Sequence, residues 1–181
     1  MIQGISAALA ALTTGQQRMD ALANDTANVN TNGFRASGRP STQGALYETG
    51  QPLDLAIEGS GAFQLAGGRQ TRDGSFQLDA SAQIVTSSGE SLMPPVQLPP
   101  GTDASAVTIG PNGSVTVGGA QVGQIQLVGR GVLHQGALEE SNVDLADTTV
   151  GQITTRTSYA AAVDALHVQD EMWASLMELR P

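Results

Sequence analysis

Few residues in this 181-residue chain have side chains suited to chemistry. The chain contains no cysteine, and all eight basic residues are arginine. This composition excludes thiolate nucleophiles, thiolate metal sites, Schiff bases and the lysine of a phosphate-binding loop. The two histidines, His134 and His167, do not have the spacing of metal ligands. We therefore predict that the chain holds no metal ion.

Three further patterns could indicate a catalytic or cofactor site. The sequence Gly59-Ser60-Gly61 follows an apolar run but lacks the third glycine and the helix of a dinucleotide-binding loop. Glu139 and Glu140 could form an acid–base pair, but a helix dipole explains carboxylates placed just before a helix. No serine lies in a nucleophile-elbow motif. We expect no catalytic residue and no cofactor, and a cell-wall enzyme remains the least favoured alternative.

Asparagines are concentrated in one segment that ends in Gly-Phe. Asparagine side chains compete with the helical backbone for hydrogen bonds, so a helix should end here, and glycine can supply a left-handed turn. The segment is either an ordinary helix C-cap with a turn or a fixed, hydrogen-bonded elbow between a helix and an extended arm. Its candidate residues are Asn24, Asn28, Asn30, Asn32, Gly33 and Phe34.

Two helices should position these residues, one at each end of the chain. From residue 1 to about 28, and from Ser141 to about 179, apolar residues recur every three or four positions, as in a coiled coil. We expect a capping box of Ser141 and Asp144, and a change of contacting face between Ile153 and Tyr159. The candidate interface residues are Ile2, Ile5, Leu9, Leu12, Met19, Leu22, Val150, Ile153, Tyr159, Val163, Leu166, Trp173 and Leu176.

Between the helices, from Leu53 to Val128, the apolar pattern changes to a period of two. Short runs at 53–57, 62–65, 75–78, 84–86, 107–109, 114–117 and 124–128 predict strands. Hairpin turns are expected at Asp73-Gly74 and at Pro111-Asn112-Gly113. The predicted fold class is α+β: terminal helices forming a coiled-coil-like domain, with a small antiparallel β domain between them. The expected divisions are 1–35, the N-terminal helix and elbow; 36–52, an extended arm; 53–133, the β domain; and 134–181, the C-terminal helix.

Composition limits the partners of the chain. A net charge of −9 argues against nucleic acid, because phosphate binding needs a basic patch. No run approaches the roughly 20 apolar residues that span a bilayer, so we expect no membrane insertion. A cleaved signal peptide is not expected, because the N-terminus lacks its basic region. The terminal helices either order on packing into a multi-subunit array or form a bundle within one molecule; the pattern alone leaves both open.

Three stretches together resemble the bacterial flagellar basal-body rod and hook (axial) proteins. They are the asparagine-rich segment 23–35, the segments 52–59 and 71–76, and the segment 135–144 leading to Asp170-Glu171-Met172. The resemblance is nearest to the distal-rod type, in a shortened form that lacks a β segment between Val128 and Gly129. Asp25 and Thr26 depart from the family pattern.

The resemblance implies a non-enzymatic structural subunit of the flagellar rod. Such a subunit would be exported by the flagellar export apparatus without a cleaved signal peptide. It would polymerise with itself and with neighbouring rod and hook proteins into a helical tube that spans the periplasm and transmits torque. The alternatives are a hook-type subunit, an adaptor or cap of the same structure, or a soluble module that clasps a partner protein.

Overall fold

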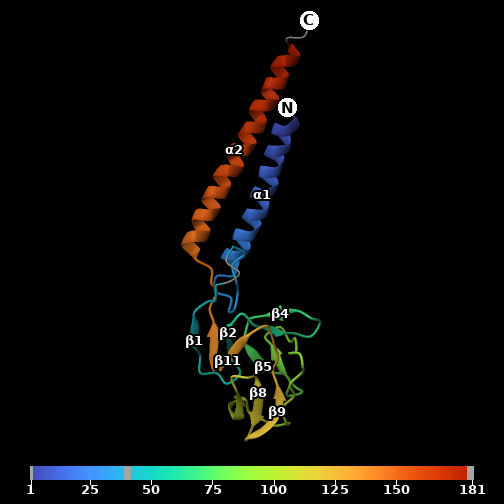
Figure 1. The fold of residues 1–181 in the computed structure, drawn as a ribbon, viewed down its shortest axis with the longest axis vertical. Coiled ribbons are helices and arrows are strands. Elements are labelled where there is room, and N and C mark those ends of the chain that lie inside the picture. Colours follow the sequence, from blue (N-terminus) through green and yellow to red (C-terminus); the bar gives the residue numbers. More distant parts are fainter. Residues whose placement is uncertain (1, 39–41, 179–181) are drawn as a thin grey trace. The chain divides into compact units, whose positions relative to one another are not determined.

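The computed structural model of the chain describes residues 2–38 and 42–178, except the side chains of residues 2–5, 176 and 178. The chain divides into two compact units (Figure 1). The helical unit contains Met1–Ala27 and Asp144–Pro181, and the β unit contains Asn28–Val143. The predicted α+β class, with terminal helices that contact each other and small antiparallel sheets between them in sequence, is confirmed.

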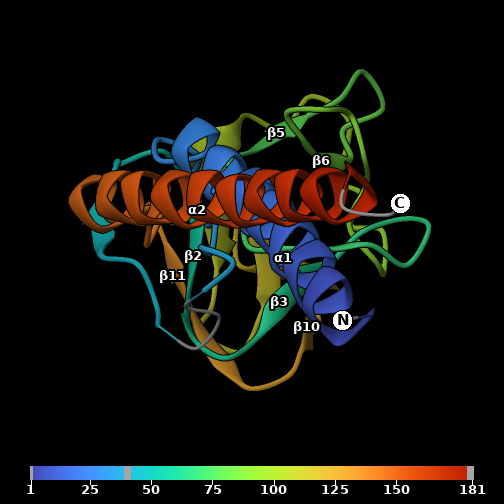
Figure 2. The same ribbon diagram turned by 90° about the horizontal axis from the view of Figure 1, so that it is seen from above.

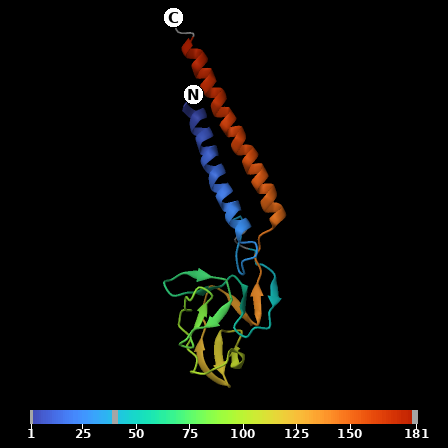
Figure 3. The ribbon, with the colours of Figure 1, turned by 180° about the vertical axis from the view of Figure 1, so that it is seen from behind.

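The helical unit is an antiparallel pair of long helices, α1 (Ile2–Ala27) and α2 (Leu145–Glu178). Figure 2 shows that the two helices cross at an angle, and Figure 3 shows that α2 continues past the N-terminal end of α1. Small residues bring the helices together: a Cβ on Gly15 would lie 3.3 Å from the Tyr159 ring, and one on Gly151 would lie 3.1 Å from Leu22. Neither helix, over its described residues, has an apolar stretch long enough to cross a membrane.

The start of α2 differs from the expected capping box. Asp144 is the N-cap: its Oδ1 accepts hydrogen bonds from the backbone N–H groups of Ala146 and Asp147, at 2.8 and 3.2 Å. Ser141 instead accepts a bond from the Val143 N–H at 3.3 Å, before the helix begins. The predicted capping box is therefore wrong, and the segment 134–181 includes the end of one strand and a second strand before its helix.

Over its described residues, the β unit consists of short antiparallel strands arranged in five small sheets. Their orders are β1–β12, β10–β3–β4, β11–β2, β5–β6 and β7–β8–β9. The strands are β1 (Leu46–Glu48), β2 (Leu55–Gly59), β3 (Ala62–Gln64), β4 (Gln70–Thr71), β5 (Phe76–Leu78), β6 (Ile84–Thr86), β7 (Val107–Ile109), β8 (Ser114–Val117), β9 (Ala120–Gln124), β10 (Leu127–Val128), β11 (Gly131–Gln135) and β12 (Ala137–Glu139), and η1 (Ala104–Ala106) is a single 3-10 turn.

One hydrophobic core supports all of these strands except β1, β4 and β12. At its centre the rings of Phe63 and Phe76 pack edge to face, with centroids 5.0 Å apart. Aliphatic side chains from both ends of the β unit surround them, as the period-two pattern predicts. The buried members are Leu53, Leu55, Ile57, Phe63, Leu65, Phe76, Ile84, Leu92, Val96, Leu98, Val107, Ile109, Val115, Ile125 and Leu133.

The two predicted hairpin turns have different outcomes. Pro111-Asn112-Gly113 connects the paired strands β7 and β8, with Gly113 at a φ of +83°, so that hairpin is confirmed. The turn at Asp73-Gly74 does not join paired strands, because β4 pairs with β3 and β5 pairs with β6. Gly74 instead lies against the backbone of Leu55, whose N–H donates to the Gly74 carbonyl at 3.0 Å. This segment therefore connects strands of two different sheets and is not a hairpin turn.

Candidate assembly surfaces and the elbow

The inner face of the helix pair contains most of the described candidate interface residues. Leu12, Met19 and Leu22 follow the same face of α1 as Gly15 and are half-buried. On α2, Tyr159 contacts Gly15, and Gln152 donates to the Thr26 hydroxyl at 3.0 Å. Val163 and Leu166 are also half-buried on α2. Of the candidates, Ile2, Ile5 and Leu176 have side chains outside the described residues.

The opposite face of α2 carries a second apolar row that α1 does not cover. Val150 and Ile153, which precede the change of contacting face predicted between Ile153 and Tyr159, are each 60% exposed. We define the outer stripe as Val150, Ile153, Thr157, Ala161 and Val168, which are exposed and lie at steps of three, four and seven on this face, where the exposed Asp164 also lies. Leu9 on α1 is also exposed, at 61%. The helical unit therefore buries one apolar face internally and leaves another in solvent.

The asparagine-rich elbow is a hydrogen-bonded turn at the start of the β unit. The Thr31 N–H donates to the Asn28 carbonyl at 3.0 Å, and the Thr31 hydroxyl donates to the Asn28 side-chain oxygen at 3.1 Å. The Phe34 N–H then donates to the Thr31 carbonyl at 3.2 Å. Asn24 lies on α1 and is exposed, as is Asn30 in the turn.

Asn32 and Gly33 fasten this turn to the rest of the β unit. The Asn32 side chain accepts from the Tyr47 hydroxyl at 3.1 Å and donates to Ser75 at 3.4 Å. Gly33 has a φ of +67°, and its N–H donates to the Glu139 carbonyl at 2.8 Å. A Cβ on Gly33 would lie 2.3 Å from the backbone carbon of Arg72, so only glycine fits here without displacing that backbone.

Asn142 completes the attachment, although no local sequence pattern marks it as a site residue. Its N–H donates to the Phe34 carbonyl at 3.2 Å, and its side-chain oxygen accepts from the Ala36 N–H at 2.6 Å. Its side-chain amide also donates to the Thr42 carbonyl at 2.8 Å. We call the Gly33–Glu139, Phe34–Asn142 and Ala36–Asn142 hydrogen bonds the clasp. The clasp joins the segment that enters the β unit to the segment that leaves it.

A buried ion pair lies next to the clasp. The Arg72 guanidinium contacts the Glu139 carboxylate at 2.5 and 2.7 Å, and Glu139 is only 1% exposed. The other Arg72 donors bond the backbone carbonyls of Ile57, Gly59 and Gly61. The interpretation of Glu139 as a carboxylate stabilised by a helix dipole is wrong, because Glu139 lies in β12 and neutralises a buried cation.

The remaining candidates for chemistry are dispersed. Gly59-Ser60-Gly61 connects β2 to β3, and its glycine carbonyls accept hydrogen bonds from Arg72. His134 lies on β11, with its Nε2 2.8 Å from an exposed Glu58 oxygen. His167 belongs to α2, in the other unit, and Glu140 is exposed while Glu139 is buried. These groups do not form a shared site within the part of the chain that the structure describes.

Comparison with known proteins places two regions of the chain in described families. Residues 56–117 match the family described as flagellar hook protein FlgE/F/G D1 domain. Residues 134–179 match the family described as flagellar basal body rod FlgEFG protein C-terminal. The first match covers strands of the β unit, and the second begins in β11 and extends along α2.

Individual relatives extend the similarity over most of the chain. A flagellar basal-body rod protein FlgG of Buchnera aphidicola subsp. Acyrthosiphon pisum is 32% identical over 78% of this chain and 70% of its own length. The FlgG of Buchnera aphidicola subsp. Schizaphis graminum is 28% identical over 99% of this chain and all of its own length. A flagellar basal-body rod protein FlgF of Caulobacter vibrioides is 28% identical over 86% and 78%, respectively. The second alignment spans 262 positions, so that relative contains segments that this 181-residue chain lacks.

Proposed function

Because the chain belongs to the flagellar basal-body rod FlgE/F/G family, we propose that it polymerises through its helical unit into a helical tube that transmits torque. Its membership makes it a structural, non-enzymatic protein of the basal-body rod, similar to FlgG and FlgF. The polymer, its geometry and its mechanical role are the parts that we propose. The outer stripe of α2 is the observation that carries the proposal.

The outer stripe supports polymerisation because it offers apolar surface that the chain itself does not bury. Burying apolar area contributes about 25 cal/mol per Å², and Val150 and Ile153 keep more than half of their surface in solvent. The inner face is a different surface, already used by the α1–α2 contact. When unlike surfaces of identical copies meet and the rotation between copies does not close a ring, the array grows as an open helix, which is the symmetry that a rod requires.

The elbow and the clasp support the torque-bearing role. A subunit that transmits rotation must resist shear in the segments that connect its units. Here those segments are bonded to each other by the three clasp hydrogen bonds and lie beside the buried pair of Arg72 and Glu139. The clasp bonds are neutral, whereas the buried bonds between Arg72 and Glu139 are charge-assisted and therefore stronger. Together, the clasp and this ion pair are suited to keep the two connecting segments together under load.

The location and partners follow from the same proposal. The chain would leave the cytoplasm through the flagellar export apparatus without losing a signal peptide, and would assemble in the rod where it spans the periplasm. Its neighbours would be copies of itself and other rod and hook proteins. A hook-type position, or an adaptor or cap position in the same axial structure, would use the same helical unit with fewer identical neighbours.

Placing a charge on the outer stripe tests the proposal. The variant Ile153→Asp should leave the thermal unfolding midpoint of the monomer within about 2 °C, because the residue is exposed. The variant protein should no longer form a polymer that sediments. Its expression should not restore motility to cells that lack the wild-type protein. Val128→Asp is the matched control, since it introduces the same charge at an exposed aliphatic residue of the β unit.

The control should polymerise at the wild-type concentration. If Ile153→Asp also polymerises normally, the outer stripe is not an assembly surface and the proposal fails. If the wild-type chain forms only a finite, stoichiometric complex with another protein and never a polymer, the adaptor or clasping module replaces the rod subunit.

A further inference from the structure

A cavity of about 440 Å³ lies between α1 and α2, on one side of the helix pair. It exists because the α1 residues along it are small, so the two helices do not fill the space between them. Arg18 lies at one end, and Tyr159 and Thr155 form the wall that α2 contributes. The full lining is Ala10, Ala11, Thr14, Gly15, Arg18, Thr154, Thr155, Ser158 and Tyr159.

The wall of this cavity contains an unused hydrogen-bonding group. The Thr155 side chain is 5% exposed, and its hydroxyl has no hydrogen-bond partner among the described residues. Neighbouring threonines of α2 bond to backbone carbonyls one turn earlier, as Thr154 does to Val150. A buried hydroxyl without a partner is costly, so a group that supplies a partner at this position gains affinity. The cavity thus offers small apolar walls, one hydroxyl and one cation.

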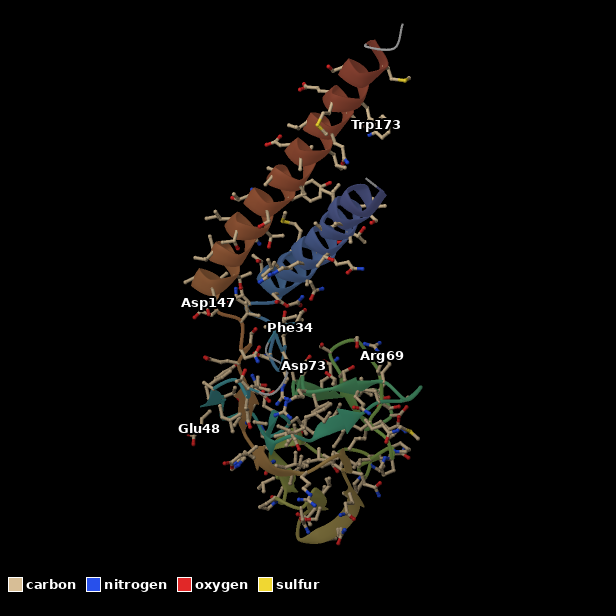
Figure 4. All side chains as sticks on the ribbon, turned by 45° about the horizontal axis from the view of Figure 1, so that its top comes forward. Phe34, Glu48, Arg69, Asp73, Asp147 and Trp173 are labelled. Carbon is tan, nitrogen blue, oxygen red and sulfur yellow. The ribbon has the colours of Figure 1, made fainter. Side chains whose placement is uncertain are left out.

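The C-terminal end of α2 carries a row with complementary properties. Trp173 is 44% exposed and Met177 is 69% exposed, and the exposed Asp170 precedes Trp173 by three positions. These three residues share one helix face, at steps of three and four. Figure 4 shows Trp173 toward the C-terminal end of α2. The indole N–H is a donor that could meet the Thr155 hydroxyl, and the Asp170 carboxylate could meet Arg18.

The spacing of the two rows agrees as well as their chemistry. From Asp170 the row reaches Trp173 after three positions and Met177 after seven. From Arg18 the cavity reaches Gly15 after three positions and Ala11 after seven, in the opposite chain direction. Because α1 is antiparallel to α2, the α2 of a second copy, oriented like the first α2, matches these steps in register. The matched pairs are Asp170 with Arg18, Trp173 with Gly15, and Met177 with Ala11.

We propose that Trp173 of one copy occupies the α1–α2 cavity of the next copy, with its indole N–H bonded to Thr155 and with Asp170 paired to Arg18. The inference rests on the proposed function, because it names one contact of the polymer. Within a copy, Tyr159 is the α2 residue that lies against Gly15. With Trp173 of the neighbour at the level of Gly15, where Tyr159 lies within a copy, the two copies are displaced by fourteen residues, or about 21 Å along the helix axis.

The spectroscopic test uses the full-length protein, whose only tryptophan is Trp173. On polymerisation its fluorescence emission should shift to shorter wavelength, because a half-exposed indole becomes buried. Polymer with unchanged Trp173 emission overturns this contact and leaves the rod subunit intact. Absence of any polymer overturns both, so the two failures can be told apart.

The variant Thr155→Val separates assembly from folding. In the monomer it removes a buried hydroxyl that has no partner, so the unfolding midpoint should stay the same or rise. In the polymer it removes the proposed acceptor, so the critical concentration should rise about threefold to tenfold. Trp173→Phe should raise it by a similar factor, and the double variant should be no worse than either single variant. Additive effects, or an unchanged critical concentration in Thr155→Val, overturn the contact.

Discussion

Replacing Gly33 by alanine tests whether the elbow depends on its close approach to the backbone of Arg72. An alanine in the left-handed region costs about 1 kcal/mol for its backbone conformation alone. At Gly33 the new Cβ would also lie 2.3 Å from the Arg72 carbon and 2.4 Å from its oxygen, so backbone must move. That movement would lengthen the 2.8 Å bond from Gly33 to Glu139, which adds about 1 kcal/mol or more. We expect a total loss of about 2 kcal/mol or more.

Gly50→Ala is the matched control for this prediction. Gly50 has a φ of +71°, close to that of Gly33, but a Cβ there would have nothing within 4 Å. It should therefore lose only the backbone contribution of about 1 kcal/mol. Urea unfolding followed by far-UV circular dichroism measures both variants, with an unchanged slope showing that the unfolded state is the same. Equal midpoints for Gly33→Ala and Gly50→Ala would refute the role assigned to the contact with Arg72.

Two further predictions concern charges in the fold. Glu139→Gln leaves Arg72 buried without its counter-charge and should lower the free energy of unfolding by about 3–5 kcal/mol. Glu140→Gln, at the exposed neighbouring position, should change it by less than about 0.5 kcal/mol, and equal losses for the two variants in urea unfolding would contradict this. Asp144→Ala removes the N-cap of α2 and should cost about 1 kcal/mol of helix stability, measured as lost helicity on heating, while Ser141→Ala should have no comparable effect.

The parts of the fold that local patterns determine could be predicted from the sequence. The two helices follow from long apolar periodicity, and the turn at Pro111-Asn112-Gly113 follows from the positive φ that Gly113 supplies. The strand β4 could not be predicted because it has only two residues, and β12 (Ala-Leu-Glu) lacks the β-branched residues that marked the equally short β6 (Ile-Val-Thr).

The site could be predicted only in part, for a related reason. The asparagine pattern located the elbow, but its partner Asn142 lies more than a hundred positions away from Ala36 in the sequence. The pair of Arg72 and Glu139 is likewise a long-range contact, and nothing local distinguishes a buried glutamate from its exposed neighbour Glu140. The face of α2 that Val150 occupies depends on where α1 packs, which periodicity alone does not determine.

The clasp also bears on how the length of the chain can change. It joins residues 33–36 directly to residues 139–142. The polypeptide between them is therefore a long loop whose two ends are hydrogen-bonded to each other. Adding or removing residues within this loop does not disturb the hydrogen bonds at its ends if the change avoids the bonded groups. A longer loop also costs little extra entropy. A longer relative and this shorter chain can thus keep the same hydrogen-bonded ends, while the polypeptide between those ends differs in length.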